Sequence, residues 1–258
     1  MTIITNWHPS HSCSPDSFTH SQVHVWRYAL NPIPPSLAPF RTWLSPEEHN
    51  RADRLINASA QRQFVVSRCM LRQLLGWYGG VPSSDIQITI AEQGKPFPVF
   101  PTGADIQCNV SHTNGLVVVA ISGSAQVGID VEAMDRTVNA LDLANRFFST
   151  REARQLAALT EDDRTWLFLT YWTCKEAYLK MRGIGLQGDL SKHEIELDID
   201  SPRASITELS AATSPKSYTL WRMNPAEGFV GALAIETHHA DVAFFDWTPH
   251  MLTPSHPF

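Results

Sequence analysis

The sequence predicts an α+β protein built from two similar halves. Each half opens on a short segment of alternating apolar and polar residues, continues through helical patterns and closes on several strand-like segments. The chain has 258 residues, 43% of them apolar, which is enough for two subdomains with their own cores. The plausible hinge is Ser-Gly-Ser-Ala at residues 122–125. We expect a loose extension over residues 1–21 and subdomains over 22–123 and 124–258, each a small antiparallel sheet with packed helices, pseudo-symmetric to one another.

In the first half, the clearest helix signal begins at Ser45, which is followed by Pro46 at the first helical position and Glu48 as partner of a capping box. A second helix over about residues 59–78 should end at Gly79-Gly80. Residues 94–98 indicate a loop, because prolines at 96 and 98 exclude a regular ladder. Strands are expected at residues 23–26, 86–90, 108–111 and 116–121.

The second half opens on a strand at residues 128–132, where Ile129 and Val131 alternate with acidic residues. Three helical patterns follow, and Gly183 ends the last of them. The helices are expected at residues 138–147, 150–159 and 162–181, and the strands that finish the chain at 194–198, 217–223, 228–236 and 242–247.

Charge and cysteine content narrow the class of protein. A formal net charge of −6 argues against a nucleic-acid-binding surface. The four cysteines show no metal-ligand or disulfide spacing, and the N-terminus lacks the pattern of a signal peptide. The longest apolar run, residues 116–121, is too short to cross a membrane. The expectation is a reduced, cytoplasmic protein that does not bind membranes.

Two acidic segments carry the chemistry. Asp130 and Glu132 alternate with apolar residues on a strand and share a face, while Glu176 and Lys180 share a helix face. Carboxylates without histidine or cysteine ligands favour Mg²⁺ over Zn²⁺, and lysines suit phosphate oxygens. This pattern indicates Mg²⁺-assisted phosphoryl chemistry. Two plainer interpretations stay open at this point: a solvated strand face, and an ordinary helix surface pair worth roughly 0.3–0.5 kcal/mol.

Five motifs in order resemble the single-chain, surfactin-synthetase-activating type of 4'-phosphopantetheinyl transferase over roughly residues 23 to 236. The motifs are Gly94-Lys95-Pro96, Asn109-Val110-Ser111-His112, Gly128-Ile129-Asp130-Val131-Glu132, Arg146-Phe147-Phe148-Ser149 with Glu152, and the stretch from Trp172 to Lys180. The resemblance implies two similar α+β halves with coenzyme A bound in the cleft between them. It also implies transfer of phosphopantetheine from coenzyme A to a serine of an apo acyl- or peptidyl-carrier protein, releasing 3',5'-ADP.

The resemblance also assigns roles to the acidic segments. It makes Asp130, Glu132 and Glu176 the Mg²⁺ ligands and places Lys180 on the diphosphate. A serine hydroxyl needs a base within reach, for which Glu176 is our first choice and Glu132 our second. Lys175 is expected to contact the cofactor or to position Glu176.

Further residues are assigned to coenzyme A by the same resemblance. Lys95 and Pro96 would lie against its nucleotide, and Ser111 and His112 would hold its 3'-phosphate. Arg51 and Arg68, on the two N-terminal helices, are candidates for the same phosphate. Each has a plainer interpretation, because glycine and proline also build turns and a basic helix face is usually solvated.

Because carrier proteins are acidic, docking requires local positive charge with apolar anchors. Arg146, Arg151 and Arg154, with Phe147 and Phe148, are the expected docking residues. The prediction is therefore a Mg²⁺-dependent, monomeric transferase. The alternatives are a catalytically silent module that binds coenzyme A or a carrier, and a Mg²⁺-dependent phosphohydrolase that cleaves nucleotides without any carrier.

Overall fold

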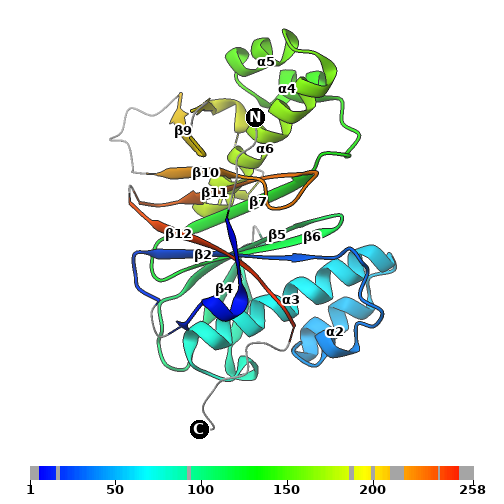
Figure 1. The fold of residues 1–258 in the computed structure, drawn as a ribbon, viewed down its shortest axis with the longest axis vertical. Coiled ribbons are helices and arrows are strands. Elements are labelled where there is room, and N and C mark those ends of the chain that lie inside the picture. The colour runs from blue at the N-terminus through cyan, green and yellow to red at the C-terminus, as the bar shows by residue number, and fades with distance from the viewer. Residues whose placement is uncertain are drawn as a thin grey trace. The chain divides into compact units, whose positions relative to one another are not determined.

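Two five-stranded sheets organise the chain, one in each of two units (Figure 1). The computed structural model describes residues 6–15, 18–91, 94–185, 189–198, 201–209, 218–237 and 239–249. The N-terminal unit comprises Asn6–Ala125 and the stretch that begins at Asp241, and the C-terminal unit comprises Gln126–Ala240. Both units combine helices with a sheet, so the predicted α+β class is confirmed. The prediction of a coenzyme A cleft stays a prediction.

The sheet of the N-terminal unit has the strand order β1-β12-β2-β6-β5. β2, β6 and β5 pair antiparallel, as the sequence predicts, whereas β12 joins β2 in parallel and β1 joins β12 in parallel. The sheet is therefore mixed. Its strands are β1 (Trp7–Pro9), β2 (Gln22–Ala29), β5 (Gln107–Thr113), β6 (Leu116–Ser122) and β12 (Asp241–Asp246).

Both ends of the chain differ from the expectation. β12, expected in the second subdomain, inserts beside β2, where Phe245 stacks on Trp26 with ring centroids 4.8 Å apart. Phe245 and Trp247 are buried in this core, so apolar burial explains why the last strand returns to the N-terminal unit. Part of the expected loose extension is ordered, since Trp7–Pro9 pairs as β1. Residues 1–5 of that extension lie outside the described residues.

The long helix α3 (Ala58–Gly79) supplies most of the helical surface of this core. Asn57 caps its first turn by accepting from the backbone N–H groups of Ser59 and Ala60, and Gly80 ends it in the left-handed conformation at φ 62°. The predicted capping box of Ser45 and Glu48 is present at the start of the short helix α2 (Pro46–Asp53). The shorter helical elements of the unit are η1 (Ser10–Ser12), α1 (Ala38–Arg41), α2 (Pro46–Asp53) and η3 (Ser83–Asp85).

A separate two-stranded sheet overturns the prediction of a loop at residues 94–98. β3 (Gln87–Ile90) pairs antiparallel with β4 (Pro96–Val99), with Ile88 opposite Pro98 and Ile90 opposite Pro96. The backbone nitrogens of residues two apart in a strand point toward the same edge, so Pro96 and Pro98 lack their N–H groups on one edge only. In a sheet of two strands they can face away from the partner, so no ladder hydrogen bond is lost.

The sheet of the C-terminal unit has the order β7-β11-β10-β9-β8 and is antiparallel throughout. The predicted capping box of Ser149 and Glu152 starts one of its helices, and acidic residues occupy the first turn of each of its α-helices. Its strands are β7 (Val127–Ala133), β8 (His193–Leu197), β9 (Arg203–Glu208), β10 (Thr219–Met223) and β11 (Phe229–Ile235). Its helices are α4 (Ala140–Phe147), α5 (Thr150–Ala157), α6 (Glu161–Arg182) and η5 (Leu190–Lys192).

All four cysteines are unpaired thiols. In the part of the chain that the structure describes, no helix combines the length and the apolar character needed to cross a membrane.

A buried polar cluster fastens the N-terminal segment to the core of its unit. His24 Nδ1 lies 2.6 Å from Tyr78 Oη and 3.5 Å from Cys13 Sγ, and Trp26 Nε1 donates to Tyr78 Oη at 3.0 Å. Burial lowers the pKa of His24 to about 4, although Asp241 acts in the opposite direction. The histidine is therefore held neutral where the unfolded chain would protonate it.

We expect His24 to make stability depend on pH between about 6.5 and about 4. In this window the unfolded state binds more protons than the folded state, so the free energy of unfolding falls as pH falls. A shift from 6.5 to about 4 corresponds to about 3 kcal/mol. Urea unfolding from pH 7.5 to 4 should show a shallower decline for His24→Gln than for wild type. Both proteins contain the same carboxylates, so the contribution of these groups to the pH dependence cancels in the comparison. An equal decline of the unfolding free energy in the two proteins would contradict this account.

Candidate active site

The acidic strand β7 lies directly against helix α6, and Gly128 is the residue that permits it. A Cβ atom at position 128 would come within 2.0 Å of Ala177 O and 2.3 Å of Met181 N. Only glycine tolerates so close an approach of strand and helix backbones. Strand and helix thereby bring Asp130, Glu132, Glu176 and Lys180 into one neighbourhood.

Asp130 forms an ion pair with Lys180. The Nζ of Lys180 donates to Asp130 Oδ1 at 2.6 Å and to the backbone oxygen of Ile129 at 3.1 Å. Asp130 is buried, while the side chain of Lys180 stays 28% exposed. The ammonium group thus lies at the edge of the acidic site, where an anion could also reach it.

Glu132 is paired with a residue that the sequence analysis did not name. The guanidinium of Arg136 donates to Glu132 Oε1, and the carboxylate is largely buried while the arginine is half-exposed. Burial and the neighbouring Asp130 raise the pKa of Glu132, and Arg136 lowers it. The spacing of four residues was the available signal, but it indicates a contact only on a helix, and Arg136 follows a strand.

Glu176 is the most constrained carboxylate of the group. It is 8% exposed, and its Oε1 is buried and accepts no hydrogen bond from any described residue. The pKa of Glu176 is raised to about 7, chiefly by burial and also by the charges of Asp130 and Glu132, while Lys180 acts in the opposite direction. A carboxyl group that titrates near neutrality beside two other acids is suited to exchanging a proton or accepting a cation.

The charge of Asp130 raises the pKa of both Glu132 and Glu176, but the three acids are not arranged as metal ligands in this conformation. Among the residues that the structure describes, no three histidine, cysteine or carboxylate side chains come close enough to hold a metal ion. The donor set nevertheless fits Mg²⁺ chemically, because it is all oxygen and one buried oxygen of Glu176 lacks a partner. A cation would have to take over Asp130 from Lys180 and Glu132 from Arg136.

Lys175 does not lie where the expected cofactor contact could be made. Its side chain is completely buried and its Nζ donates to Glu152 Oε2 at 2.7 Å, to the backbone oxygen of Leu190 at 2.9 Å and to that of His193. An ammonium group enclosed by these acceptors cannot contact a phosphate. Successive helix positions are about 100° apart, which explains why Lys175 faces Glu152 while the neighbouring Glu176 faces the acidic residues of β7.

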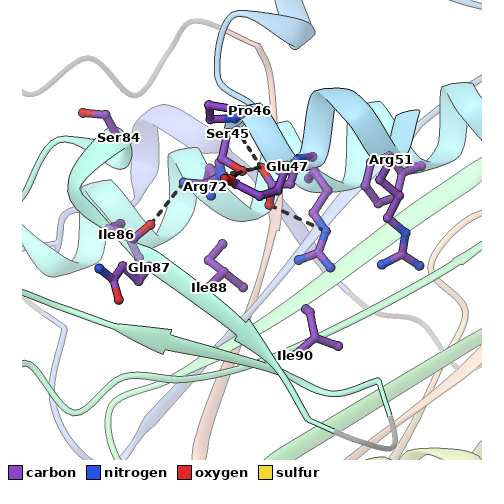
Figure 2. A pocket seen from close by; sticks show the side chains of 13 residues that line it. Ser45, Pro46, Glu47, Arg51, Arg72, Ser84, Ile86, Gln87, Ile88 and Ile90 are labelled. Atoms are coloured by element: carbon purple, nitrogen blue, oxygen red, sulfur yellow. Dashed lines mark hydrogen bonds and ion pairs between the residues drawn. The ribbon is translucent and has the colours of Figure 1, made fainter. Parts of the chain in front are cut away.

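A second candidate site lies in the N-terminal unit, as Figure 2 shows. Arg51 on α2, Arg68 on α3 and isoleucines 86, 88 and 90 border a pocket of about 550 Å³. Phe64 forms part of its wall, with the guanidinium of Arg51 5.0 Å and that of Arg68 5.8 Å from the ring centroid. The pocket combines two cationic groups with apolar walls, a lining suited to a phosphorylated ring compound.

Glu48 holds the arginines of α3 in place. Its Oε2 accepts from Arg72 Nε at 2.6 Å, and its Oε1 lies 3.9 Å from Arg68 Nε. Arg72 also donates to the backbone oxygens of Ser83 and Ile86, so its role is structural. Burial lowers the pKa of Arg68, Glu48 raises it, and Arg51 lowers it. A bound anion would stabilise a buried guanidinium group that lies beside a second positive charge.

The four residues predicted near the nucleotide lie on or next to two neighbouring strands, β4 and β5. Lys95 and Pro96 are buried at the start of β4, and the Nζ of Lys95 lies 5.9 Å from the centroid of Phe97. Ser111 is buried on β5, whereas His112 is exposed. Neighbouring residues of a strand project to opposite faces, so the side chains of Ser111 and His112 are not brought together.

The expected docking surface is only partly available. Phe148 is buried, with its ring 5.1 Å from that of Phe168, so its prediction as an exposed anchor is wrong. Arg151 Nε pairs with Glu194 Oε1 at 3.1 Å, and Arg154 is exposed on α5. Arg151, Arg154 and the exposed Leu209 border a hollow of about 660 Å³. Arg146 lies over the ring of Phe147, 4.9 Å from its centroid.

Comparison with known proteins identifies the family. The model of the 4'-phosphopantetheinyl transferase superfamily matches residues 126–234, and that of the 4'-phosphopantetheinyl transferase N-terminal region matches 29–124. The chain is 32% identical over 230 residues to "4'-phosphopantetheinyl transferase HetI" of Nostoc sp., covering 88% of this chain and 90% of that protein. The chain belongs to the 4'-phosphopantetheinyl transferase superfamily. The predictions of the family and of an enzyme of this class are confirmed.

Further members of the superfamily are similar over shorter stretches. "4'-phosphopantetheinyl transferase Sfp" of Bacillus subtilis is 29% identical, covering 72% of this chain and 80% of that protein. Among solved structures, holo-[acyl-carrier-protein] synthase of Thermotoga maritima matches with a TM-score of 0.36 and 20% identity, covering 43% of this chain and 62% of that one.

Proposed function

We propose that this chain transfers the 4'-phosphopantetheine of coenzyme A to a serine of an apo acyl- or peptidyl-carrier protein, releasing 3',5'-ADP in a Mg²⁺-dependent reaction. Membership of the superfamily supports the reaction class. The observation that carries the proposal for this chain is Glu176, a buried carboxyl group with an unpartnered oxygen beside the Asp130–Lys180 pair.

The reaction needs one bond made and one broken. The serine oxygen of the carrier bonds to the phosphorus that bears pantetheine, while the bond from that phosphorus to the departing 3',5'-ADP breaks. Glu176 takes the hydroxyl proton in our first choice, and Glu132 in our second. The ammonium group of Lys180, partly exposed beside Asp130, would stabilise the charge that develops on the 5'-phosphate of the departing 3',5'-ADP.

Asp130, Glu132 and Glu176 would hold the Mg²⁺ ion. Bound there, Mg²⁺ would supply Lewis-acid stabilisation of the diphosphate. The all-oxygen donor set and the unpartnered oxygen of Glu176 support this assignment.

We propose that the pocket of the N-terminal unit binds the 3'-phosphate of coenzyme A through Arg51 and Arg68. The support is the pair of guanidinium groups beside Phe64 in a hollow of about 550 Å³. Lys95, Pro96, Ser111 and His112 remain candidates for nucleotide contacts. A monomeric state and a cytoplasmic location stay predictions from the sequence.

Intact-mass spectrometry of an apo carrier protein tests the proposed reaction. Incubated with the full chain, coenzyme A and Mg²⁺, the carrier should gain the mass of one phosphopantetheine, and EDTA should prevent the gain. Carrier binding with no gain, for several acyl and peptidyl carriers, would favour a binding module. Cleavage of coenzyme A without a carrier would favour a phosphohydrolase.

For the carrier, we propose docking of its acidic surface at Arg146 and at the hollow bordered by Arg151, Arg154 and Leu209. The exposed, positively charged Arg154 gives the cleanest test, because reversing Arg151 would also place two acids together at Glu194. Arg154→Glu should raise the KM for the carrier about fivefold and leave the KM for coenzyme A unchanged. Arg203→Glu, another exposed arginine of the same unit, is the matched control. Equal carrier KM values for both variants would refute this docking site.

A further inference from the structure

A further pocket of the N-terminal unit has no part in the proposed reaction. It measures about 430 Å³ and is bordered on one side by Gln73, Gly76 and Trp77 of α3. Residues three and four apart share a helix face, which explains why these three residues border the same pocket. The rest of the lining comes from Thr42, Trp43 and the segment Val81, Pro82, Ser83 and Ser84.

Gln73 is the unusual member of this lining. It is 2% exposed, and neither its Nε2 nor its Oε1 has a hydrogen-bond partner among the residues that the structure describes. Buried side-chain amides nearly always have partners, because an unpartnered donor or acceptor loses its water without compensation. An amide with both groups unpartnered, in the wall of a pocket, therefore indicates a ligand that supplies one acceptor and one donor.

The remaining walls select the shape of that ligand. The ring of Trp77 is held by edge contacts with Trp26 and Tyr78, whose ring centroids lie 5.8 Å and 5.0 Å away. Gly76 lets the following loop approach, since a Cβ atom there would lie 3.0 Å from Val81 O. Rigid indole and proline walls favour a flat ring.

We propose that this pocket binds a planar ring compound with an adjacent ring N–H and carbonyl, the edge of a lactam. The lactam N–H would donate to Gln73 Oε1, and its carbonyl would accept from Gln73 Nε2. Because the amide is covered in the structure, binding requires a side chain of the wall to rotate, and the proposal assigns this movement to Trp43, a half-buried residue of the lining. The site adjoins the pocket of Arg51 and Arg68 at Ser84, which is the one described residue that lines both, and the proposal holds whatever reaction the acidic residues perform.

The test uses quinolin-2-one as the probe and the full chain as the receptor. Titration followed by the tryptophan indole N–H signals in NMR should give a Kd below about 1 mM. The signal of Trp43 should shift. The N-methyl analogue, which lacks the donor, should bind at least about tenfold more weakly. No measurable binding, or equal binding of both compounds, would overturn the proposal.

Two variants separate the role of the amide from general damage. Gln73→Leu should weaken probe binding at least about tenfold, yet unfold at the wild-type temperature or above it, because two unpartnered polar groups are removed. Gln63→Leu is the matched control, since the Gln63 amide on the same helix already donates to Thr113 O. Unchanged binding by Gln73→Leu would refute the site. Competition between coenzyme A and the probe would refute a separate site.

Discussion

Replacing Glu176 by glutamine is expected to lower kcat for phosphopantetheine transfer by about 10³-fold while leaving the fold intact. A positioned base contributes about 10² to 10⁴ in rate, and Glu176 is also a proposed Mg²⁺ ligand. Glutamine keeps the volume of the side chain and has no charge to bury. Because burial already raises the pKa of Glu176 to about 7, the neutral substitute should be tolerated by the fold.

The pH dependence distinguishes a base from a purely structural residue. A base acts when deprotonated, so wild-type kcat should rise with pH up to the pKa of Glu176, about 7. A cation bound by the neighbouring acids would lower that pKa and move the rise to lower pH. In Glu176→Gln this rise should disappear. Single-turnover transfer at pH values from 5 to 8.5 measures it.

Glu161→Gln provides the matched control for this experiment, because Glu161 is an exposed acid on the first turn of the same helix. It should keep kcat within about twofold of wild type. If Glu176→Gln kept kcat within tenfold, a difference of about 1.4 kcal/mol at the barrier, neither the base nor the metal assignment would stand.

Local patterns predicted the elements that carry the site. Alternation placed Asp130 and Glu132 on one strand, and capping residues located the starts of α2 and α5. The spacing of Glu176 and Lys180 indicated their shared helix face. Such features depend only on residues a few positions apart, so the sequence is sufficient to find them.

Partners distant in sequence were not predicted. Strand β12 pairs with β2 across more than 200 residues, and no local pattern specifies that pairing. The same holds for Lys175, whose acceptors come from α5, η5 and β8, and for Phe148, which packs on α6. The sequence analysis expected Lys175 to contact a cofactor and Phe148 to contact a carrier protein, whereas tertiary packing buries both side chains.

The ion pair of Lys175 and Glu152 is expected to give the largest stability effect in the chain. Both side chains are completely buried, and Glu152 also accepts from the backbone N–H groups of Ser149 and Ile195. Lys175→Met removes the cation and leaves a buried carboxylate without its counter-charge. The free energy of unfolding should fall by about 3–5 kcal/mol.

A second substitution tests that reason. Lys175→Met combined with Glu152→Gln replaces both charges, and the double variant should regain part of the stability lost by Lys175→Met alone, because the uncompensated charge is gone. Urea unfolding of wild type, Lys175→Met, Glu152→Gln and the double variant gives the four free energies of this double-mutant cycle. Additive losses would show that the ion pair is not what stabilises this core.

The same variants decide whether Lys175 has any catalytic part. Since its ammonium group lies 2.7 Å from Glu152 and also donates to two backbone oxygens, it should act only through folding. kcat per folded molecule of the double variant, measured below its unfolding transition, should stay within about threefold of wild type. A loss near that of Glu176→Gln, in protein shown to be folded, would mean that Lys175 controls the position of Glu176 on α6.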